Sequence, residues 1–390
     1  MSRTVVLSAA RTPFGKLGGG LSTVDATELG GTAIEAALQR AEVKPDQVQH
    51  VVMGQVLQAG QGQIPSRQAQ IKAGIPKEVS SETINKVCAS SLRAVGLIDQ
   101  AVRAGDLEVA VAGGMESMSL APYLLPKARF GFRMGDAETV DAMTHDGLTN
   151  PFTGKMMAPE ASEVAEELEM TRADLDKFAL RSHQLAVQAI DEGRLAEEIA
   201  PVTVSSKKGD TTVEVDEGPR SEATLESLAG LKPISEGGTH TAGNSPGVND
   251  GAGALVLAAE EWAKANDREW LATIVAQAAV ADDFAYLART PAKATDLALE
   301  KAGLKIDDID LFEINEAFAS VALNSMRMLG VGEDRVNVNG GAIALGHPIG
   351  ASGARILTTL IWELRRRGGG RGVAAICSGG GQGDAVIVEV

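Results

Sequence analysis

Apolar positions recur along the chain with two periods, one typical of buried strands and one typical of helices. Short continuous apolar runs predict strands near 4–9, 51–56, 108–113 and 253–258. Between them, apolar residues at helical spacing predict helices near 26–41 and 89–104. Because the strand runs are apolar on both faces, we expect sheets that helices cover on both sides, which is an α/β fold.

The second part of the chain repeats the first. RAEVKPDQVQHVVMG at 40–54 matches KAGLKIDDIDLFEIN at 301–315, an offset of 261 residues, and CASSLRA at 88–94 matches GASGARI at 350–356, an offset of 262. EVAVAGGMES at 108–117 matches GVAAICSGGG at 372–381, an offset of 264. The second copy predicts strands near 272–278, 310–314, 373–377 and 385–389, and helices near 291–303 and 351–367.

One further match locates an insertion. GAGALVLAA at 251–259 resembles GDAVIVEV at 383–390, but the offset is only 132 residues, so the first copy contains about 132 additional residues. We predict a first half-fold from 1–118 plus 250–268, an inserted loop domain at 119–249 and a second half-fold at 269–390. In the insertion, ADLDKFALRSHQLAVQAIDEG predicts an amphipathic helix that Thr171 and Asp174 cap and Gly193 ends. Two half-folds packed side by side would place a site at their junction.

Charge and cysteine content narrow the function. The chain has 52 acidic and 36 basic residues, for a net charge of −16, which argues against a nucleic-acid partner. Two cysteines do not make a disulfide scaffold. No apolar run is long enough to span a membrane, and the N-terminus lacks the apolar core of a signal peptide. These features predict a cytoplasmic protein without a membrane partner.

Both cysteines are candidates for chemistry. Cys88 lies at or just before the start of the helix at 89–104, and this position favours the thiolate. The alternative is a buried and inert thiol. Cys377 follows an apolar strand and precedes three glycines, whose N–H groups can approach an anion.

His347 and Asn315 are the other candidates. His347 lies three residues before the position that matches Cys88 in the repeat, so the two loops converge if the half-folds face one another. A lone loop histidine is otherwise a solvated or capping residue. Asn315 follows the strand LFEI, where it is either a turn residue or a polar group that points into the same junction.

These segments together resemble the thiolase family over the whole chain. NKVCASS is similar to the nucleophile loop, NEAF to the asparagine loop, GGAIALGHPIGASGAR to the histidine loop and CSGGGQG to the second cysteine loop. The resemblance implies a duplicated αβαβα layered fold with an inserted loop domain, commonly in a homotetramer that is a dimer of dimers. It also implies reversible Claisen condensation of two acetyl-CoA, or CoA-dependent thiolysis of 3-ketoacyl-CoA in fatty acid metabolism. Coenzyme A and acyl-CoA are then substrates, with no permanently bound cofactor and no metal.

The resemblance also implies residue roles. Cys88 would carry the acyl group after activation by His347, and Cys377 would move the α-proton. Asn315, through a bound water, and His347 would stabilise the enolate oxygen, while the N–H groups of Cys88 and Gly379 would form a second oxyanion hole. The residues that match CoA contacts of the family are Leu148, Arg220, Ser227, Gly247 and Phe318.

Three loops depart from the usual family pattern. Cys88-Ala89-Ser90-Ser91 replaces Cys-Gly-Ser-Gly, and Asn244-Ser245-Pro246-Gly247 replaces Asn-Ala-Ser-Gly. Met156-Met157 stands where short-chain biosynthetic members often have His-Met. These departures leave acyl-chain preference and CoA recognition open, and the direction of the reaction is open as well. Two alternatives are a decarboxylating enzyme of the ketoacyl-synthase type, which would have a histidine where Asn315 stands, and a catalytically silent thiolase-like scaffold.

Overall fold

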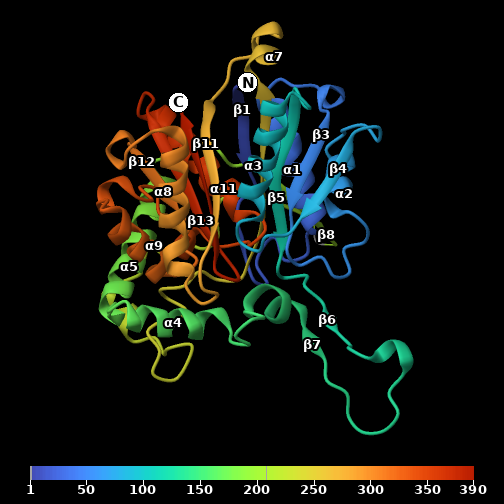
Figure 1. Ribbon diagram of the computed structural model, residues 1–390. Coiled ribbons are helices and arrows are strands. Elements are labelled where there is room, and N and C mark those ends of the chain that lie inside the picture. Colours follow the sequence, from blue (N-terminus) through green and yellow to red (C-terminus); the bar gives the residue numbers. More distant parts are fainter. Residues whose placement is uncertain (1, 208) are drawn as a thin grey trace.

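The computed structural model describes residues 2–207 and 209–390, and its centre is one mixed sheet (Figure 1). Met1 and Lys208, which fall in the predicted ranges 1–118 and 119–249, lie outside the described residues. In the described part of the chain the sheet has ten strands in the order β12-β13-β14-β11-β1-β10-β5-β3-β4, with β2 paired to β10. The strands are β1 (Thr4–Arg11), β2 (Gly15–Lys16), β3 (His50–Gly54), β4 (Ser80–Ile84), β5 (Val109–Ser117), β10 (Asn249–Ala259), β11 (Ala272–Ala281), β12 (Leu311–Ile314), β13 (Arg371–Ser378) and β14 (Gln382–Glu389).

The two halves of the sheet have the same topology. β10 lies between β1 and β5 and is antiparallel to both, and β14 has the same relation to β11 and β13. The next strand outward is parallel in each half, β3 beside β5 and β12 beside β13. The halves meet where Val5 and Val6 of β1 pair with Thr273 and Ala272 of β11. The eight strands predicted from the repeat are confirmed, and so is the duplicated fold.

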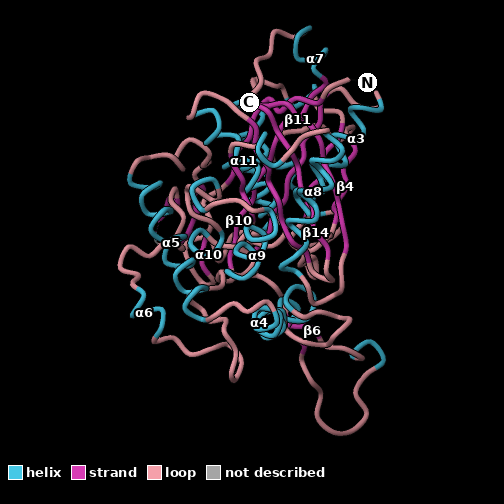
Figure 2. Tube along the Cα trace, turned by 60° about the vertical axis from the view of Figure 1, so that its left-hand side comes forward, coloured by secondary structure: helices cyan, strands magenta, loops and turns pink. Residues whose placement is uncertain are grey.

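Helices form three layers, one between the two halves of the sheet and one on the outer face of each half. The central layer consists of α3 (Ser90–Ala104) and α11 (Ser352–Arg366), which contact each other and strands of both halves. α1 (Ala26–Arg40) and α2 (Pro65–Lys72) cover the outer face of the first half, while α8 (Thr290–Ala302) and α9 (Ala319–Leu329) cover that of the second (Figures 1 and 2). The layers therefore alternate as αβαβα, as expected.

The equivalent helices α3 and α11 approach most closely near their first turns. The N–H of Ala354 donates to Oγ of Ser91 at 2.9 Å. A Cβ on Gly353 would lie only 2.4 Å from the backbone nitrogen of Leu92. This contact places the segments that precede the two helices, which contain Cys88 and His347, side by side.

We expect Gly353→Ala to destabilise the protein by about 1–3 kcal/mol, because the new methyl group would force the two helices apart. Gly230→Ala is the matched control, since its Cβ would lie 3.6 Å from the nearest atom, and its effect should stay within about 0.5 kcal/mol. Urea unfolding followed by circular dichroism measures both. Equal stability of the two variants would contradict this account of the helix contact.

The chain between β5 and β10 lies mostly below the sheet in Figure 1. The predicted helix is α5 (Arg172–Asp191), and its capping box is confirmed: the N–H of Asp174 donates to Oγ1 of Thr171 at 3.2 Å, and the N–H of Thr171 donates to the Asp174 carboxylate at 3.0 Å. Gly193 then has φ 73°. The other elements of the segment are β6 (Tyr123–Leu124), η2 (Ala128–Phe130), β7 (Val140–Asp141), η3 (Met143–Leu148), α4 (Met157–Glu167), β8 (Val202–Ser206), β9 (Gly209–Val213) and α6 (Leu225–Ala229).

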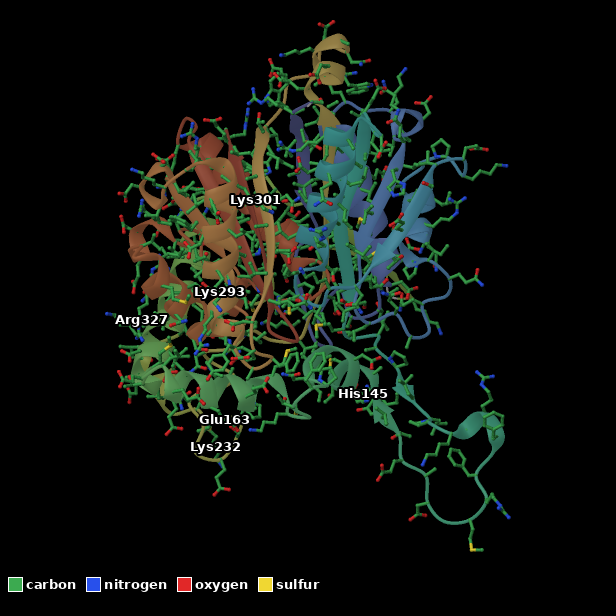
Figure 3. All side chains as sticks on the ribbon, viewed as in Figure 1. His145, Glu163, Lys232, Lys293, Lys301 and Arg327 are labelled. Atoms are coloured by element: carbon green, nitrogen blue, oxygen red, sulfur yellow. The ribbon has the colours of Figure 1, made fainter. Side chains whose placement is uncertain are left out.

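Residues 120–140 form an arm that projects away from the body, and Figure 3 shows its side chains spread around the extended backbone. Phe130 and Met134 on this arm are 93% and 96% exposed. The remaining elements of the chain are η1 (Pro45–Gln47), α7 (Glu260–Ala265), η4 (Leu287–Arg289), η5 (Ile306–Asp308), η6 (Glu333–Arg335) and α10 (Ala342–Leu345). Among the described residues, no helix has both the length and the apolar character needed to cross a bilayer.

Candidate active site

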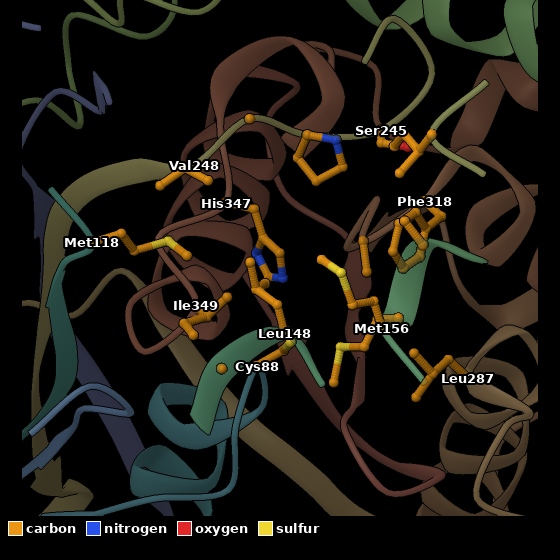
Figure 4. A pocket seen from close by; sticks show the side chains of 17 residues that line it. Cys88, Met118, Leu148, Met156, Ser245, Val248, Leu287, Phe318, His347 and Ile349 are labelled. Atoms are coloured by element: carbon orange, nitrogen blue, oxygen red, sulfur yellow. The ribbon is translucent and has the colours of Figure 1, made fainter. Parts of the chain in front are cut away.

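The structure brings four predicted residues, Cys88 from the first half-fold and Asn315, His347 and Cys377 from the second, to the junction of the half-folds. Cys88 precedes α3, His347 precedes α11, Asn315 follows β12 and Cys377 lies near the end of β13. Cys88 and His347 line the same cavity (Figure 4), and Nδ2 of Asn315 lies 3.5 Å from Nδ1 of His347. Cys377 is close enough to Cys88 for the two thiols to interact electrostatically.

Contacts across the junction hold the Cys88 loop in place. Lys86 forms an ion pair with Asp384 of β14, and Oγ of Ser378 donates to the Lys86 carbonyl. Between these contacts and the nucleophile, Val87 has φ 44°, a left-handed conformation that is costly for a β-branched residue. The second half-fold therefore fixes the backbone that presents Cys88.

The Cys88 sulfur is a buried neutral thiol. The backbone N–H groups of Cys88 and Gly379 lie near the sulfur and act to lower its pKa, so they would also favour negative charge that develops beside it. Burial outweighs these donors and raises the pKa of the Cys88 thiol to about 12. The prediction that the helix N-terminus favours the thiolate is therefore wrong. α3 does begin close to Cys88, but burial of the thiol outweighs the effect of the helix.

His347 is placed as a neutral base. Its Nδ1 lies 2.6 Å from Oγ of Ser352, and that hydroxyl donates its one proton to the Pro348 carbonyl at 2.9 Å. The hydroxyl oxygen therefore accepts from Nδ1–H, which leaves the lone pair on Nε2. Nε2 is buried and has no hydrogen-bond partner in the described residues. Burial, assisted by the charge of Arg355, lowers the pKa of His347 to about 3.

We expect the rate of Cys88 alkylation by iodoacetamide to rise with pH, by up to about 10-fold per unit between about pH 7 and 10, without a plateau. The reason is that a thiol with a raised pKa beside a histidine with a lowered pKa rests as a neutral pair. The Cys377→Ala variant leaves Cys88 as the only thiol, so mass spectrometry of that variant reports Cys88 alone. A plateau with a midpoint below about pH 7 would instead reveal a thiolate–imidazolium pair.

Asn315 and Cys377 are fully buried. Oδ1 of Asn315 accepts from Nη2 of Arg355 at 3.4 Å. Burial raises the pKa of Cys377 well above its usual value, and the neighbouring Cys88 adds to the shift. Cys377 therefore also rests as a neutral thiol, able to give up a proton before it acts as a base.

Glu116 was not among the residues predicted from the sequence. Its carboxylate accepts from the N–H groups of Val56, Leu57 and Gly350 at 3.0 to 3.1 Å, which ties the loop after His347 to the first half-fold. Burial raises the pKa of Glu116 to about 7. The signal that could have identified it is a carboxylate near the end of the otherwise uncharged strand segment VAVAGGMES.

The cavity beside Cys88 has a volume of about 210 Å³ and a largely apolar lining. Three of the predicted CoA contacts, Leu148, Gly247 and Phe318, lie in its wall (Figure 4). Of the buried polar side-chain atoms in this wall, Nε2 of His347 and Oγ of Ser245 have no partner within the described chain. Unpartnered polar atoms in an apolar wall indicate where a ligand supplies hydrogen bonds.

A second cavity, of about 260 Å³, shares the Ser245–Val248 wall with the first. Lys16, His183 and Arg220 line it, so it presents two cations in an acidic protein. Ser227 lines neither cavity, and its hydroxyl accepts from the Thr224 N–H at 3.0 Å in the cap of α6. The structure thus brings four of the five predicted CoA contacts to two adjoining cavities and leaves Ser227 outside them.

Two thiols, a neutral histidine and an amide, set in loops from both halves of a duplicated α/β fold, define an acyl-transfer site of the thiol type. The family model for the thiolase N-terminal domain matches residues 4–261, and that for the thiolase C-terminal domain matches residues 268–390. The chain belongs to the thiolase family.

Individual relatives agree over their full lengths. The chain is 50% identical to the acetyl-CoA acetyltransferase of Cupriavidus necator, with 100% of both chains covered. It is 48% identical to the probable acetyl-CoA acetyltransferase of Mycolicibacterium smegmatis, over 99% of this chain and 100% of the relative. The crystal structure of the Bacillus anthracis acetyl-CoA acetyltransferase superimposes with a TM-score of 0.98 at 39% identity, covering 100% of this chain and 99% of that one.

Proposed function

We propose that this chain is an acetyl-CoA C-acetyltransferase that condenses two acetyl-CoA to acetoacetyl-CoA and, in reverse, cleaves 3-ketoacyl-CoA with CoA. One observation carries the proposal: the unpartnered Nε2 of His347 and the Cys88 thiol line one apolar cavity. The names of the full-length relatives support the same activity. They do not favour the ketoacyl-synthase or silent-scaffold alternatives.

The first half-reaction transfers an acetyl group to Cys88. Nε2 of His347 takes the thiol proton as the sulfur attacks the thioester carbonyl carbon. The N–H groups of Cys88 and Gly379 hold the resulting oxyanion until the C–S bond to CoA breaks. Cys377 then gives its proton to the departing CoA thiolate, which leaves a Cys377 thiolate and a protonated His347.

The second half-reaction uses the Cys377 thiolate and the protonated His347 that the first half-reaction leaves. The Cys377 thiolate removes an α-proton from a second acetyl-CoA, while protonated His347 and a water on Asn315 stabilise the enolate oxygen. The enolate carbon attacks the acetyl group on Cys88, and collapse of this intermediate releases acetoacetyl-CoA. Cys88 recovers its proton from His347, so every group returns to its starting state.

CoA would cross the two adjoining cavities. Leu148, Gly247 and Phe318 contact the apolar arm next to the thioester, and Arg220, with Lys16 beside it, contacts the phosphates. The Ser245 hydroxyl is available to an amide of the arm, whereas Pro246 has no N–H to offer. Ser227 would contact CoA only if the ligand extends beyond the two cavities to α6. No resident cofactor or metal takes part.

The proposal extends to the location and assembly of the protein, as a cytoplasmic homotetramer that is a dimer of dimers and acts in fatty acid metabolism. Two free cysteines suit a reducing compartment. The aromatic side chains exposed on the arm at 120–140 suit a subunit contact. A charge of −16 suits neither nucleic acid nor an anionic membrane surface as partner. The repeated strand order supports division into 1–118 plus 250–268, 119–249 and 269–390.

The test is kcat/KM for CoA-dependent thiolysis across 3-ketoacyl-CoAs from C4 to C16. The small cavity and the names of the relatives predict the highest value at C4. A broad profile would assign the enzyme to the degradative type. Failure to cleave acetoacetyl-CoA in the presence of CoA would overturn the proposal, and release of CO2 from a malonyl thioester would favour the ketoacyl-synthase alternative.

A further inference from the structure

A buried ion pair lies directly behind the candidate site. Arg355 of α11 is fully buried, and its Nη1 lies 3.1 Å from Oε2 of Glu313 on β12. Its Nη2 donates to Oδ1 of Asn315 at 3.4 Å, two residues further along the chain. One guanidinium therefore joins a buried carboxylate to an amide of the site, and none of these contacts was predicted from the sequence.

Stability alone is a weak reason for such a pair. Two charges withdrawn from water rarely stabilise a fold more than apolar side chains of the same volume would. Here the cost is visible in Glu313, because burial raises the pKa of its carboxyl above the usual value despite the neighbouring Arg355. Nε of Arg355 is also buried without a partner in the described chain. This arrangement suits a role at the site better than a role in folding.

The chemistry of the guanidinium determines which end of the Asn315 amide faces the reaction. Arginine can only donate, so it selects the amide oxygen and turns the NH2 group towards His347, where Nδ2 lies 3.5 Å from Nδ1. In this orientation the NH2 group donates to the bridging water, which keeps both of its protons free to donate onward. The opposite amide rotamer would accept one of those protons and leave the water only one for the enolate oxygen. Without this donor, the Nδ1–H of His347 would attract the amide oxygen and favour the opposite rotamer.

We propose that Arg355, held by Glu313, is a positioning residue that acts through Asn315 to orient its amide as a donor for the enolate step. The inference rests on the proposed function, because it concerns one half-reaction of it. It predicts that loss of the guanidinium fork impairs enolate formation far more than acyl transfer to Cys88.

The experiment is a double-mutant cycle with Arg355→Lys, Asn315→Ala and both together, each read out on two steps. Cys88 acetylation by acetyl-CoA is followed by quenched mass spectrometry, and enolate formation by exchange of the acetyl-CoA methyl protons in D2O. Arg355→Lys should slow the exchange by about 10-fold or more, the loss expected for one misdirected oxyanion donor, and leave acetylation within about 3-fold. In the Asn315→Ala background it should cause no further loss of exchange.

Two further variants make the outcome decisive. Glu313→Gln keeps a hydrogen bond to Arg355 but removes the charge, so it should show the same selective pattern more weakly, and it carries the test if Arg355→Lys does not fold. Arg103→Lys is the control, since Arg103 pairs with Asp99 near the other end of α3. Equal slowing of both steps, or losses that multiply in the double variant, would overturn the inference. A wild-type protein that is neither acetylated nor active in exchange would instead count against the proposed function.

Discussion

Replacing Cys88 with alanine should lower kcat for thiolysis of acetoacetyl-CoA by about 10⁴-fold or more, the loss typical of a deleted covalent nucleophile. The wild-type protein incubated with acetyl-CoA should gain about 42 Da, the mass of one acetyl group, on the peptide that contains Cys88. The variant should gain nothing. Intact-mass and peptide mass spectrometry measure both, and an active enzyme whose Cys88 stays unmodified would refute the mechanism.

No neighbouring group should rescue the variant. The Ser90 hydroxyl donates to the Val87 carbonyl at 2.6 Å and accepts from the Lys86 N–H, so it is committed to the loop. Oγ of Ser91 accepts from the Ala354 N–H in the contact between α3 and α11. Ser90, which the usual family pattern shares, and Ser91, which replaces a glycine of that pattern, are thus both structural. The Gly353→Ala variant perturbs that same contact while leaving Cys88 intact, so it separates a loss of stability from a loss of the nucleophile.

The internal repeat made most of the fold predictable. Strands buried on both faces leave continuous apolar runs, and all eight predicted strands came from such runs. β4 (SSETI) was missed because it is a largely polar strand at the edge of the sheet, and α2 (PSRQAQIK) because few of its residues are apolar. Strands and helices at the edge of the fold form because they pair with neighbouring elements, and the hydrophobic pattern of their own sequence does not mark them.

The residues of the site could be predicted from the sequence, but their protonation states could not. The four loops carry distinctive residues, and the repeat already indicated that the loops of Cys88 and His347 converge. The state of the Cys88 thiol was mispredicted because a helix N-terminus is a local feature, whereas burial depends on the whole fold. Contacts such as Lys86 with Asp384 join residues almost 300 positions apart, and no local pattern marks them.

His347→Ala should abolish both half-reactions, whereas Cys377→Ala should abolish the second and only slow the first, in which Cys377 protonates the departing CoA. His347 activates Cys88 and then stabilises the enolate, so its loss removes a general base and an oxyanion donor, each typically about 10²-fold or more. We expect overall turnover to fall by about 10⁴-fold, and acetylation of Cys88 by acetyl-CoA to become too slow to detect within a wild-type turnover time.

Cys377→Ala is the matched control, because Cys377 is buried beside the same sulfur but enters only when a proton reaches the departing CoA or leaves the α-carbon. That variant should still acquire an acetyl group on Cys88 while exchange of the methyl protons of acetyl-CoA in D2O falls by about 10²-fold or more. Rapid acetylation of Cys88 in His347→Ala would contradict the assignment of Nε2 as the base, since the raised pKa of the Cys88 thiol leaves almost no thiolate at neutral pH without one. Equal loss of acetylation in both variants would mean that Cys377 is as necessary as His347 for acyl transfer to Cys88.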